Sequence, residues 1–189
     1  MSAGREAAAP VRHLYVHLPF CVHRCGYCDF VTVVGRRGSG EHGGYVEALL
    51  AELALAGQPS GTPAGALALG GADSGGAGAL LDSVFLGGGT PTFTELPELA
   101  RLLRGLPAAR EVTVEANPDT VTPELAEALR EAGVTRVSLG AQTFQPRLLE
   151  TLERTATPDD VRGAFAHLRA AGFDNLSLDL VYGIPGQSP

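Results

Sequence analysis

Three thiols lie within one short stretch of this chain, which we call the cysteine loop (residues 21–32). The segment HLPFCVHRCGYCDF holds Cys21, Cys25 and Cys28, and the 189-residue sequence has 3 cysteines in all. An odd number of cysteines, behind a polar and alanine-rich opening that does not read as a secretory leader, argues against a disulfide framework. Thiolates at this spacing favour a soft metal, so we expect the loop to bind zinc or iron.

Two metal centres fit this set of ligands. Zinc in a structural site takes four ligands, and His17 or His23 could supply the fourth. A four-iron cluster held by three protein thiolates would leave one iron open to another molecule. The spacing alone does not decide between such a cluster, a zinc-stabilised binding module and thiols that bind no metal.

A run of glycines is the second candidate site, and we call residues 87–90 the glycine turn. In FLGGGTPT, residues 85–92, three glycines follow an expected strand. Without Cβ atoms the backbone can approach a ligand closely there, although the same pattern also suits a tight connection between a strand and a helix. The run lacks the Lys-Ser/Thr pair of a phosphate-binding loop. Its interest comes from its expected place beside the cysteine loop.

Four polar side chains further along the chain are candidates for ligand binding. Glu115 ends a strand, where a carboxylate can bind a ribose diol or an ammonium group, or simply face solvent. Asp179 interrupts the apolar run LSLDLVYGI. Because burying an unpaired carboxylate is costly, we expect Asp179 to be buried with a partner or a ligand. Gln142 follows a strand and could contact a ligand or cap the next helix. Arg154 lies in a helical stretch, where exposure to solvent is the commoner state.

The elements that must position these residues alternate between strand and helix. Apolar patterns predict five strands, near residues 13–18, 83–87, 111–116, 135–140 and 175–181. Helical patterns separate them, and repeated connections of this kind require parallel strands. The predicted fold class is therefore α/β, as a doubly wound sheet or a β/α barrel. Both architectures place the loops that follow the strands, and hence the candidate residues, at one end of the sheet.

Two segments of the chain resemble each other. Each begins with a threonine cap followed by proline, at Thr122 and Thr157, and each ends at a glycine, Gly133 or Gly172. A strand containing Ser-Leu follows both glycines. The pattern predicts two successive helix and strand units of the same kind.

Composition limits the class of protein. With 44% apolar residues and a net charge of −7 spread along the chain, we expect a soluble, cytoplasmic protein with no nucleic-acid partner and no transmembrane segment. Residues 1–12 are expected to form a flexible N-terminus and residues 13–189 one core. A Gly/Ala-rich stretch at about 57–79 has nothing periodic to bury, which predicts an insertion in that core.

Taken together, these motifs resemble those of radical SAM proteins. The C-x3-C-x2-C loop with Tyr27 before its third cysteine, the GGGTP turn and the Glu-Ala-Asn-Pro strand end are similar to those of the oxygen-independent coproporphyrinogen III oxidases and their relatives, the radical SAM heme chaperones. The resemblance runs from about Tyr15 to the end of the chain, interrupted by residues 57–79. It implies a partial, TIM-like (β/α) barrel, of which this chain holds the first five or so units. Family members are about twice as long, so the rest of the barrel and a second domain are expected to be missing from this chain.

The resemblance also implies ligands. It implies a 4Fe–4S cluster on Cys21, Cys25 and Cys28, with S-adenosylmethionine (SAM) on the fourth iron, which would explain three cysteines rather than four. An electron donor for the cluster is an implied partner, and no catalytic residue is assigned. The implied contacts to SAM are Tyr15, Tyr27, Gly88, Gly89, Thr90, Glu115, Gln142, Arg154 and Asp179.

Phe30 separates two functions within this family. Coproporphyrinogen oxidases of this type carry a further cysteine two residues after the third, where this chain has Phe30, as the heme chaperones do. The resemblance therefore favours a chaperone that binds heme and transfers it to apo-hemoproteins, with the porphyrinogen oxidase as the alternative. It leaves open whether the chain is an enzyme, and the heme ligand is expected in the missing part.

Overall fold

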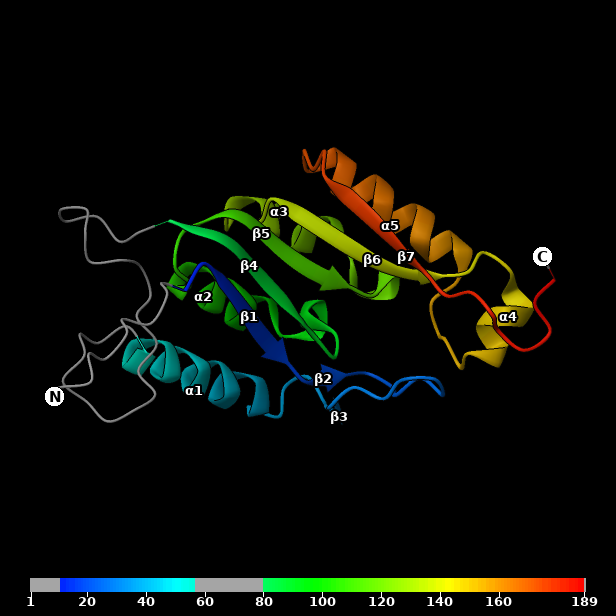
Figure 1. Cartoon of the computed structure of the whole chain (residues 1–189), viewed down its shortest axis with the longest axis horizontal. Helices are drawn as coiled ribbons and strands as arrows, with labels where there is room; N and C mark the ends of the chain where they lie inside the picture. Colours follow the sequence, from blue (N-terminus) through cyan, green and yellow to red (C-terminus); the bar gives the residue numbers. More distant parts are fainter. Residues whose placement is uncertain (1–10, 57–79, 189) are drawn as a thin grey trace, which may run out of the picture.

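The computed structural model describes residues 11–56 and 80–188 (Figure 1). The stretch expected to be an insertion, residues 57–79, and most of the expected flexible N-terminus, residues 1–10, lie outside the described residues. In the described ranges one layer of helices packs on a twisted parallel sheet. No helix within these ranges is both long and apolar enough to cross a membrane.

The sheet contains five parallel strands in the order β1-β4-β5-β6-β7. They are β1 (His13–Leu18), β4 (Leu81–Gly88), β5 (Ala109–Ala116), β6 (Arg136–Gln142) and β7 (Leu176–Leu180). All five predicted strands are therefore confirmed. A doubly wound sheet reverses its strand order and carries helices on both faces. Here neighbours in the sheet are also successive along the chain, which is the arrangement of an open part of a β/α barrel.

The helices lie between the strands as the patterns predicted. They are α1 (Glu41–Ala56), α2 (Leu96–Gly105), α3 (Pro123–Glu131), α4 (Pro146–Thr151) and α5 (Pro158–Ala170), with 3-10 turns η1 (Pro91–Phe93) and η2 (Pro118–Thr120). In succession, α1, α2, α3 and α5 pack against one another on one face of the sheet. The short α4 stands apart from this layer, near the C-terminal end of the described chain (Figure 1).

The two similar segments form two similar units. Thr122 and Thr157 each accept a hydrogen bond from the backbone N–H three residues further on, at 3.2 Å in both helices. Gly133 and Gly172 adopt positive φ angles of 85° and 88°, the left-handed conformation in which glycine ends helices without strain. The predicted caps and helix ends are thus confirmed.

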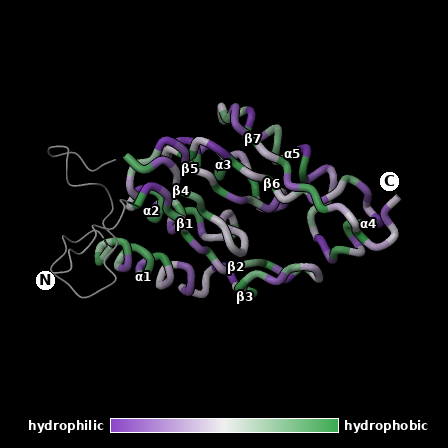
Figure 2. The backbone as a smooth tube through the Cα atoms, viewed as in Figure 1, coloured by the Kyte–Doolittle hydropathy of each residue, from purple (hydrophilic) through white to green (hydrophobic). Residues whose placement is uncertain are grey.

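The two faces of the sheet differ in polarity. Side chains that meet the helices are apolar, and Val84, Val114 and Val137 are completely buried among them. Along each strand, polar residues alternate with these apolar ones, so purple and green interleave along the strands in Figure 2. The second face therefore presents polar side chains, and its carboxyl-terminal end carries the candidate site.

A small second sheet, which the sequence patterns did not predict, closes the base of the cysteine loop. Strand β2 (Phe20–Cys21) pairs in parallel with β3 (Val33–Val34). The amide of Val33 also donates to Pro19 O at 2.9 Å. The two ends of the loop are thereby held together next to the end of β1.

Candidate functional site

A pocket of about 270 Å³ opens at the carboxyl ends of the five parallel strands. Its size lies near the lower end of the range for small-molecule sites. The pocket is where the fold predicts function, since all the loops that follow the strands meet there. Its lining includes Cys21, Cys25, Tyr27, Cys28, Gly88, Gly89, Thr90, Glu115, Gln142, Arg154 and Asp179. Eleven of the twelve predicted site residues are therefore brought together, and Tyr15 is the exception.

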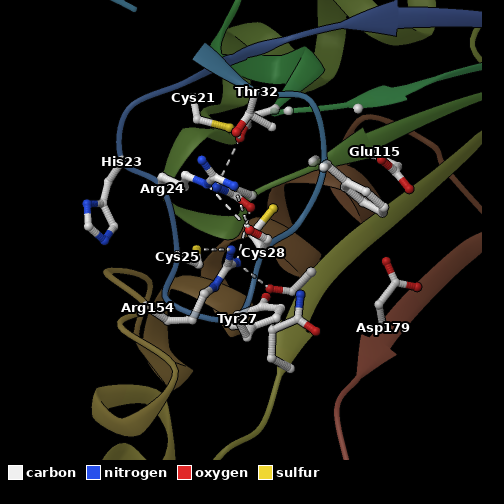
Figure 3. Close-up of a pocket in the computed structure, with 18 of the residues that line it drawn as sticks. Cys21, His23, Arg24, Cys25, Tyr27, Cys28, Thr32, Glu115, Arg154 and Asp179 are labelled. Carbon is white, nitrogen blue, oxygen red and sulfur yellow. Dashed lines mark hydrogen bonds between the residues drawn. The ribbon is translucent and has the colours of Figure 1, made fainter. Parts of the chain in front are cut away.

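The three cysteines surround the pocket but have different surroundings (Figure 3). Cys21 is buried, and its Sγ accepts a hydrogen bond from Thr90 Oγ1 at 3.6 Å. Cys25 is half-buried and accepts from Arg154 Nη1, also at 3.6 Å. Burial raises the pKa of the Cys21 thiol, and the Thr90 hydrogen bond opposes that change. In the part of the chain that the structure describes, no three His, Cys, Asp or Glu side chains are grouped tightly enough to hold a metal ion.

Neither histidine that could complete a zinc site faces the thiols as a ligand. The ring of His17 is bound through Nε2 to Val31 O at 2.8 Å and through Nδ1 to the Tyr15 hydroxyl at 3.1 Å. Both of its nitrogens are thus engaged. His23 is exposed and lines the edge of the pocket, and its ring lies on the outer side of the cysteine loop (Figure 3). The geometry therefore gives no support to a zinc site of three cysteines and one of these histidines.

At each glycine of the glycine turn, a different neighbour explains why the residue has no side chain. A Cβ at Gly87 would lie 2.8 Å from the Glu115 carboxylate, and one at Gly88 would lie 2.6 Å from the His17 ring. Gly88 also has a φ of 111°, which residues with a side chain rarely adopt. A Cβ at Gly89 would lie 2.5 Å from Pro19 O. Gly87 and Gly88 thus admit the side chains of Glu115 and His17, and Gly89 permits the turn to meet the backbone that leads into the cysteine loop.

The glycine turn is hydrogen-bonded to that backbone. Gly89 N donates to Leu18 O, and Thr90 N donates to Phe20 O, both at 2.8 Å. The Thr90 hydroxyl accepts from Asn117 Nδ2 at 3.2 Å while it donates to Cys21. These bonds connect the ends of β1, β4 and β5, so that one cysteine is fixed by the same network as the turn.

Two carboxylates face the pocket from β5 and β7, the strands on either side of β6. Glu115 is partly buried, and desolvation, with a smaller contribution from the charge of Asp179, raises its pKa, while a hydrogen bond from the Gly88 backbone lowers it. Asp179 is exposed, because β7 is the edge strand of the described sheet. The predicted burial of Asp179 was wrong, but its predicted partner exists: Ser138 Oγ donates to Asp179 Oδ1 at 2.8 Å. The carboxylates of Glu115 and Asp179 can accept hydrogen bonds from a diol or an amine.

Gln142 is placed by an irregularity at the end of β6. The pairing of β6 with β7 shifts between Gly140 and Gln142, and Gln142 has a φ of 60°. Bulges and left-handed residues with side chains concentrate at functional sites, where they redirect a side chain. Here the amide of Gln142 lies over Gly140, where a Cβ would be 2.8 Å from its Nε2. It does not cap α4 with its side chain, because the cap residue is Gln145.

Arg154 lies in the pocket and not in solvent. The helix α4 ends before it, and Glu153, with a φ of 54°, turns the chain back toward the sheet. Nη2 of Arg154 then donates to Gly140 O at 2.7 Å and to Asn117 Oδ1 at 3.1 Å. Its Nε is buried and has no partner among the described residues. A buried unpaired N–H of a guanidinium is expected to have an acceptor, and a ligand carboxylate would supply one.

The two predicted tyrosines behave differently. Tyr27 lines the pocket from within the cysteine loop (Figure 3). Tyr15 lies nearer the start of β1, where its ring stacks on Phe85 at a centroid separation of 6.1 Å. It does not line the pocket, and its hydroxyl is bound to His17. A contact from Tyr15 to SAM therefore stays a prediction.

Other lining residues were not singled out from the sequence. Asn117 and Ser138 each bind a predicted site residue, as described above, and Arg24, Phe30 and Thr32 also line the pocket. Asn117 stood within the quoted Glu-Ala-Asn-Pro motif. Ser138 occurred in the repeated Ser-Leu strand pattern, so a signal was present for both, but only the register of β5, β6 and β7 shows which residues they meet.

The donor set fits the two groups that the resemblance implies. Three thiols are sufficient to hold an iron–sulfur cluster with one iron left open. The unpaired N–H of Arg154 and the acceptors Glu115 and Asp179 suit a ligand that carries a carboxylate, an amine and a diol.

Comparisons with known proteins agree with this reading of the pocket. The model of the radical SAM superfamily matches residues 15–189. A heme chaperone HemW of Mycobacterium tuberculosis is 38% identical over 93% of this chain and 43% of its own length. An oxygen-independent coproporphyrinogen III oxidase of Bradyrhizobium diazoefficiens is 32% identical over 100% of this chain and 38% of its own length.

A solved structure shares the fold over nearly the whole chain. The coproporphyrinogen III oxidase HemN of Escherichia coli superposes with a TM-score of 0.75 at 27% identity, over 98% of this chain and 40% of that one. This chain thus spans less than half the length of these relatives.

Proposed function

The chain belongs to the radical SAM superfamily, and on that basis we propose that it is part of a heme chaperone that carries a 4Fe–4S cluster and SAM. The observation that carries the proposal is the single pocket in which three thiols, the glycine turn and Arg154 meet. The similarity to HemW over 93% of the chain supports the choice of chaperone.

In this proposal Cys21, Cys25 and Cys28 hold the cluster. The buried Nε of Arg154 points to the carboxylate of SAM as its acceptor, because an unpaired buried N–H is costly. Glu115 and Asp179 would bind the ribose diol, with Ser138 fixing Asp179 through its hydrogen bond. When bound, the cluster and SAM supply one-electron chemistry that no amino-acid side chain offers.

The cargo and the partners are also part of the proposal. We infer that the full-length protein binds heme, transfers it to an apo-hemoprotein and works in the cytoplasm with an electron donor for its cluster. Phe30 stands where porphyrinogen oxidases of this type carry a further cysteine, and it lines the pocket as a residue that is 64% exposed. A phenylalanine offers no thiolate, so this position favours heme binding over porphyrinogen oxidation.

The alternative function is oxygen-independent coproporphyrinogen III oxidation. The superposition on HemN, at a TM-score of 0.75, is the observation that favours it. The two functions use the same cluster and SAM, so they differ in what the full-length protein does with a porphyrin.

Two experiments on the full-length protein test the proposal. After anaerobic purification, iron, sulfide and zinc are quantified and the absorption spectrum is recorded. Iron and sulfide with broad visible absorption that bleaches on reduction support the cluster, whereas a colourless protein with one bound zinc contradicts it. The Cys25→Ser variant is the matched control and should not retain the cluster.

The second experiment separates chaperone from oxidase. The protein is incubated anaerobically with reductant, SAM and either heme or coproporphyrinogen III. Stable heme binding without turnover, followed by transfer to an apo-hemoprotein, supports the chaperone. Formation of protoporphyrinogen would establish the oxidase instead.

A further inference from the structure

We propose that His17 is a positioning residue that ties the cysteine loop to the sheet and to the glycine turn. This inference rests on the proposed function, since it concerns how the loop is held for its cluster. His17 lies on the polar face of β1, four residues before the first cysteine, and its ring contacts the cysteine loop, the glycine turn and Tyr15 of its own strand.

The first contact holds the distal end of the cysteine loop. His17 Nε2 lies 2.8 Å from Val31 O. Further along the chain, the backbone amides of Val33 and Gly35 bind Pro19 O and Cys21 O, at 2.9 and 3.0 Å. Among the hydrogen bonds of the described residues, the bond to Val31 is therefore the first after Cys28 that fastens the loop to the body of the sheet. Without it, the segment after Cys28 could pivot about the start of β3.

The second contact, together with the first, selects one tautomer of the neutral ring. A carbonyl oxygen only accepts, so Nε2 must carry the proton that it donates to Val31 O. In the neutral ring Nδ1 is then an acceptor, and the Tyr15 hydroxyl at 3.1 Å donates to it. A ring whose two nitrogens are both used in this way is held in one orientation and one tautomer.

The third contact joins the ring to the glycine turn. A Cβ built at Gly88 would lie 2.6 Å from both Cε1 and Nδ1 of His17. The ring therefore packs directly against the backbone of the turn that borders the pocket. His17 thus contacts both the cysteine loop, at Val31 O, and the glycine turn, at Gly88, so its ring couples the positions of these two segments.

The first test reads the tautomer directly and does not require a cluster. Full-length protein with isotopically labelled histidine gives long-range proton–nitrogen correlation spectra at neutral pH. We expect His17 to carry its proton on Nε2 and to exchange slowly with the other tautomer. A proton on Nδ1, or rapid averaging of the two forms, would contradict the proposed hydrogen bonds.

The second test compares cluster retention between variants. His17→Leu removes both hydrogen bonds, and because residues that orient metal ligands typically contribute 10- to 100-fold to metal affinity, we expect the reconstituted cluster to be lost about tenfold faster in air. His17→Gln keeps an N–H that can reach Val31 O and should restore most of the retention. His13→Leu is the matched control, since His13 lies on the same face of β1 but binds Ser83 Oγ at 2.9 Å.

The outcomes separate this inference from the proposed function. If wild-type protein assembles no cluster, the proposed function and this inference both fail. If wild type assembles the cluster and His17→Leu retains it as long as wild type does, only the assignment of His17 is wrong. Faster loss in His17→Leu with recovery in His17→Gln and no change in His13→Leu supports the positioning role.

Discussion

The cysteine loop and the glycine turn follow the neighbouring strands β1 and β4 and border the same pocket, but they are supported very differently. The glycine turn continues a central strand, and its Thr90 is 3% exposed. The cysteine loop leaves the edge strand of the sheet and exposes apolar side chains such as Val22, Phe30 and Val31, with exposed fractions of 52%, 64% and 79%. The glycine turn is part of the core, while the cysteine loop is attached to the core from outside.

The difference indicates how the two segments contribute to the site. Gly89 N and Thr90 N bind the backbone that leads into the cysteine loop, so the turn is the fixed base on which the loop begins. Between its ends the loop is held by single side chains: Arg154 binds Cys25, and His17 binds Val31 O. We therefore expect changes in the turn to affect stability and site together, and changes in the loop to affect the site alone.

The largest effect is expected for Gly89→Ala. The new Cβ would lie 2.5 Å from Pro19 O and 2.6 Å from Pro19 C, and backbone atoms cannot move aside as a flexible side chain can. We expect a loss of about 3 kcal/mol in the free energy of unfolding, at the upper end of overpacking effects, measured by urea denaturation.

A matched control for this substitution is Gly163→Ala. It adds the same methyl group within α5, where no heavy atom lies within 4 Å of the added Cβ. It should stabilise the helix by about 0.5 to 1 kcal/mol. If Gly89→Ala proved as harmless as this control, the turn would not be the rigid base described here.

A smaller effect, dependent on pH, is expected for Glu115→Gln. Burial raises the pKa of Glu115 in the folded chain above its ordinary 4.5. Between pH 4.5 and this raised pKa, the folded chain therefore binds more protons than the unfolded chain. Stability is therefore lost as the pH rises through the raised pKa. The variant should be more stable than wild type at pH 7, and the difference should disappear below about pH 4. Unfolding measured across this range would count against the prediction if the difference were constant.

A still smaller gain is expected for Glu153→Gly, at the turn that directs Arg154 toward the cysteine loop. A left-handed residue with a side chain costs about 1 to 2 kcal/mol, and the flexibility of glycine in the unfolded chain costs about 0.5 to 1 kcal/mol. With a φ of 54° at Glu153, we expect a net stabilisation of about 0.5 kcal/mol. Glu150→Gly, within α4, is the control and should be destabilising in the same thermal unfolding experiment.

The smallest effect on stability is expected for Cys25→Ser, in the middle of the cysteine loop. Cys25 is half-buried, and among the described residues its side chain is hydrogen-bonded only to Arg154 Nη1. The free energy of unfolding of the metal-free chain should change by less than about 0.5 kcal/mol, although the cluster is lost. A large destabilisation would show that the loop belongs to the core, which would remove the distinction between the two segments.

Local patterns predicted the elements well because their causes are local. Strand alternation, the caps at Thr122 and Thr157 and the left-handed glycines depend on residues that are close in sequence. The pairing of β2 with β3 escaped prediction, since two-residue strands carry no periodicity. The burial expected for Asp179 was wrong because an apolar run predicts a central strand, whereas β7 lies at the edge of the described sheet.

By itself, the sequence determined the ligand types and their spacing: three thiols in one loop, a run of glycines, and polar residues at strand ends. Only the tertiary structure decided which of them meet. Arg154 reaches Cys25 across 129 positions of sequence, and Ser138 reaches Asp179 across 41. Such contacts follow from the register of parallel strands and from a left-handed turn after the short helix α4, and no local preference of the residues encodes either distance. The same holds for His17. Its place in the sequence suggested a metal ligand, whereas its place in the sheet brings its ring against Val31 O of the cysteine loop and Gly88 of the glycine turn.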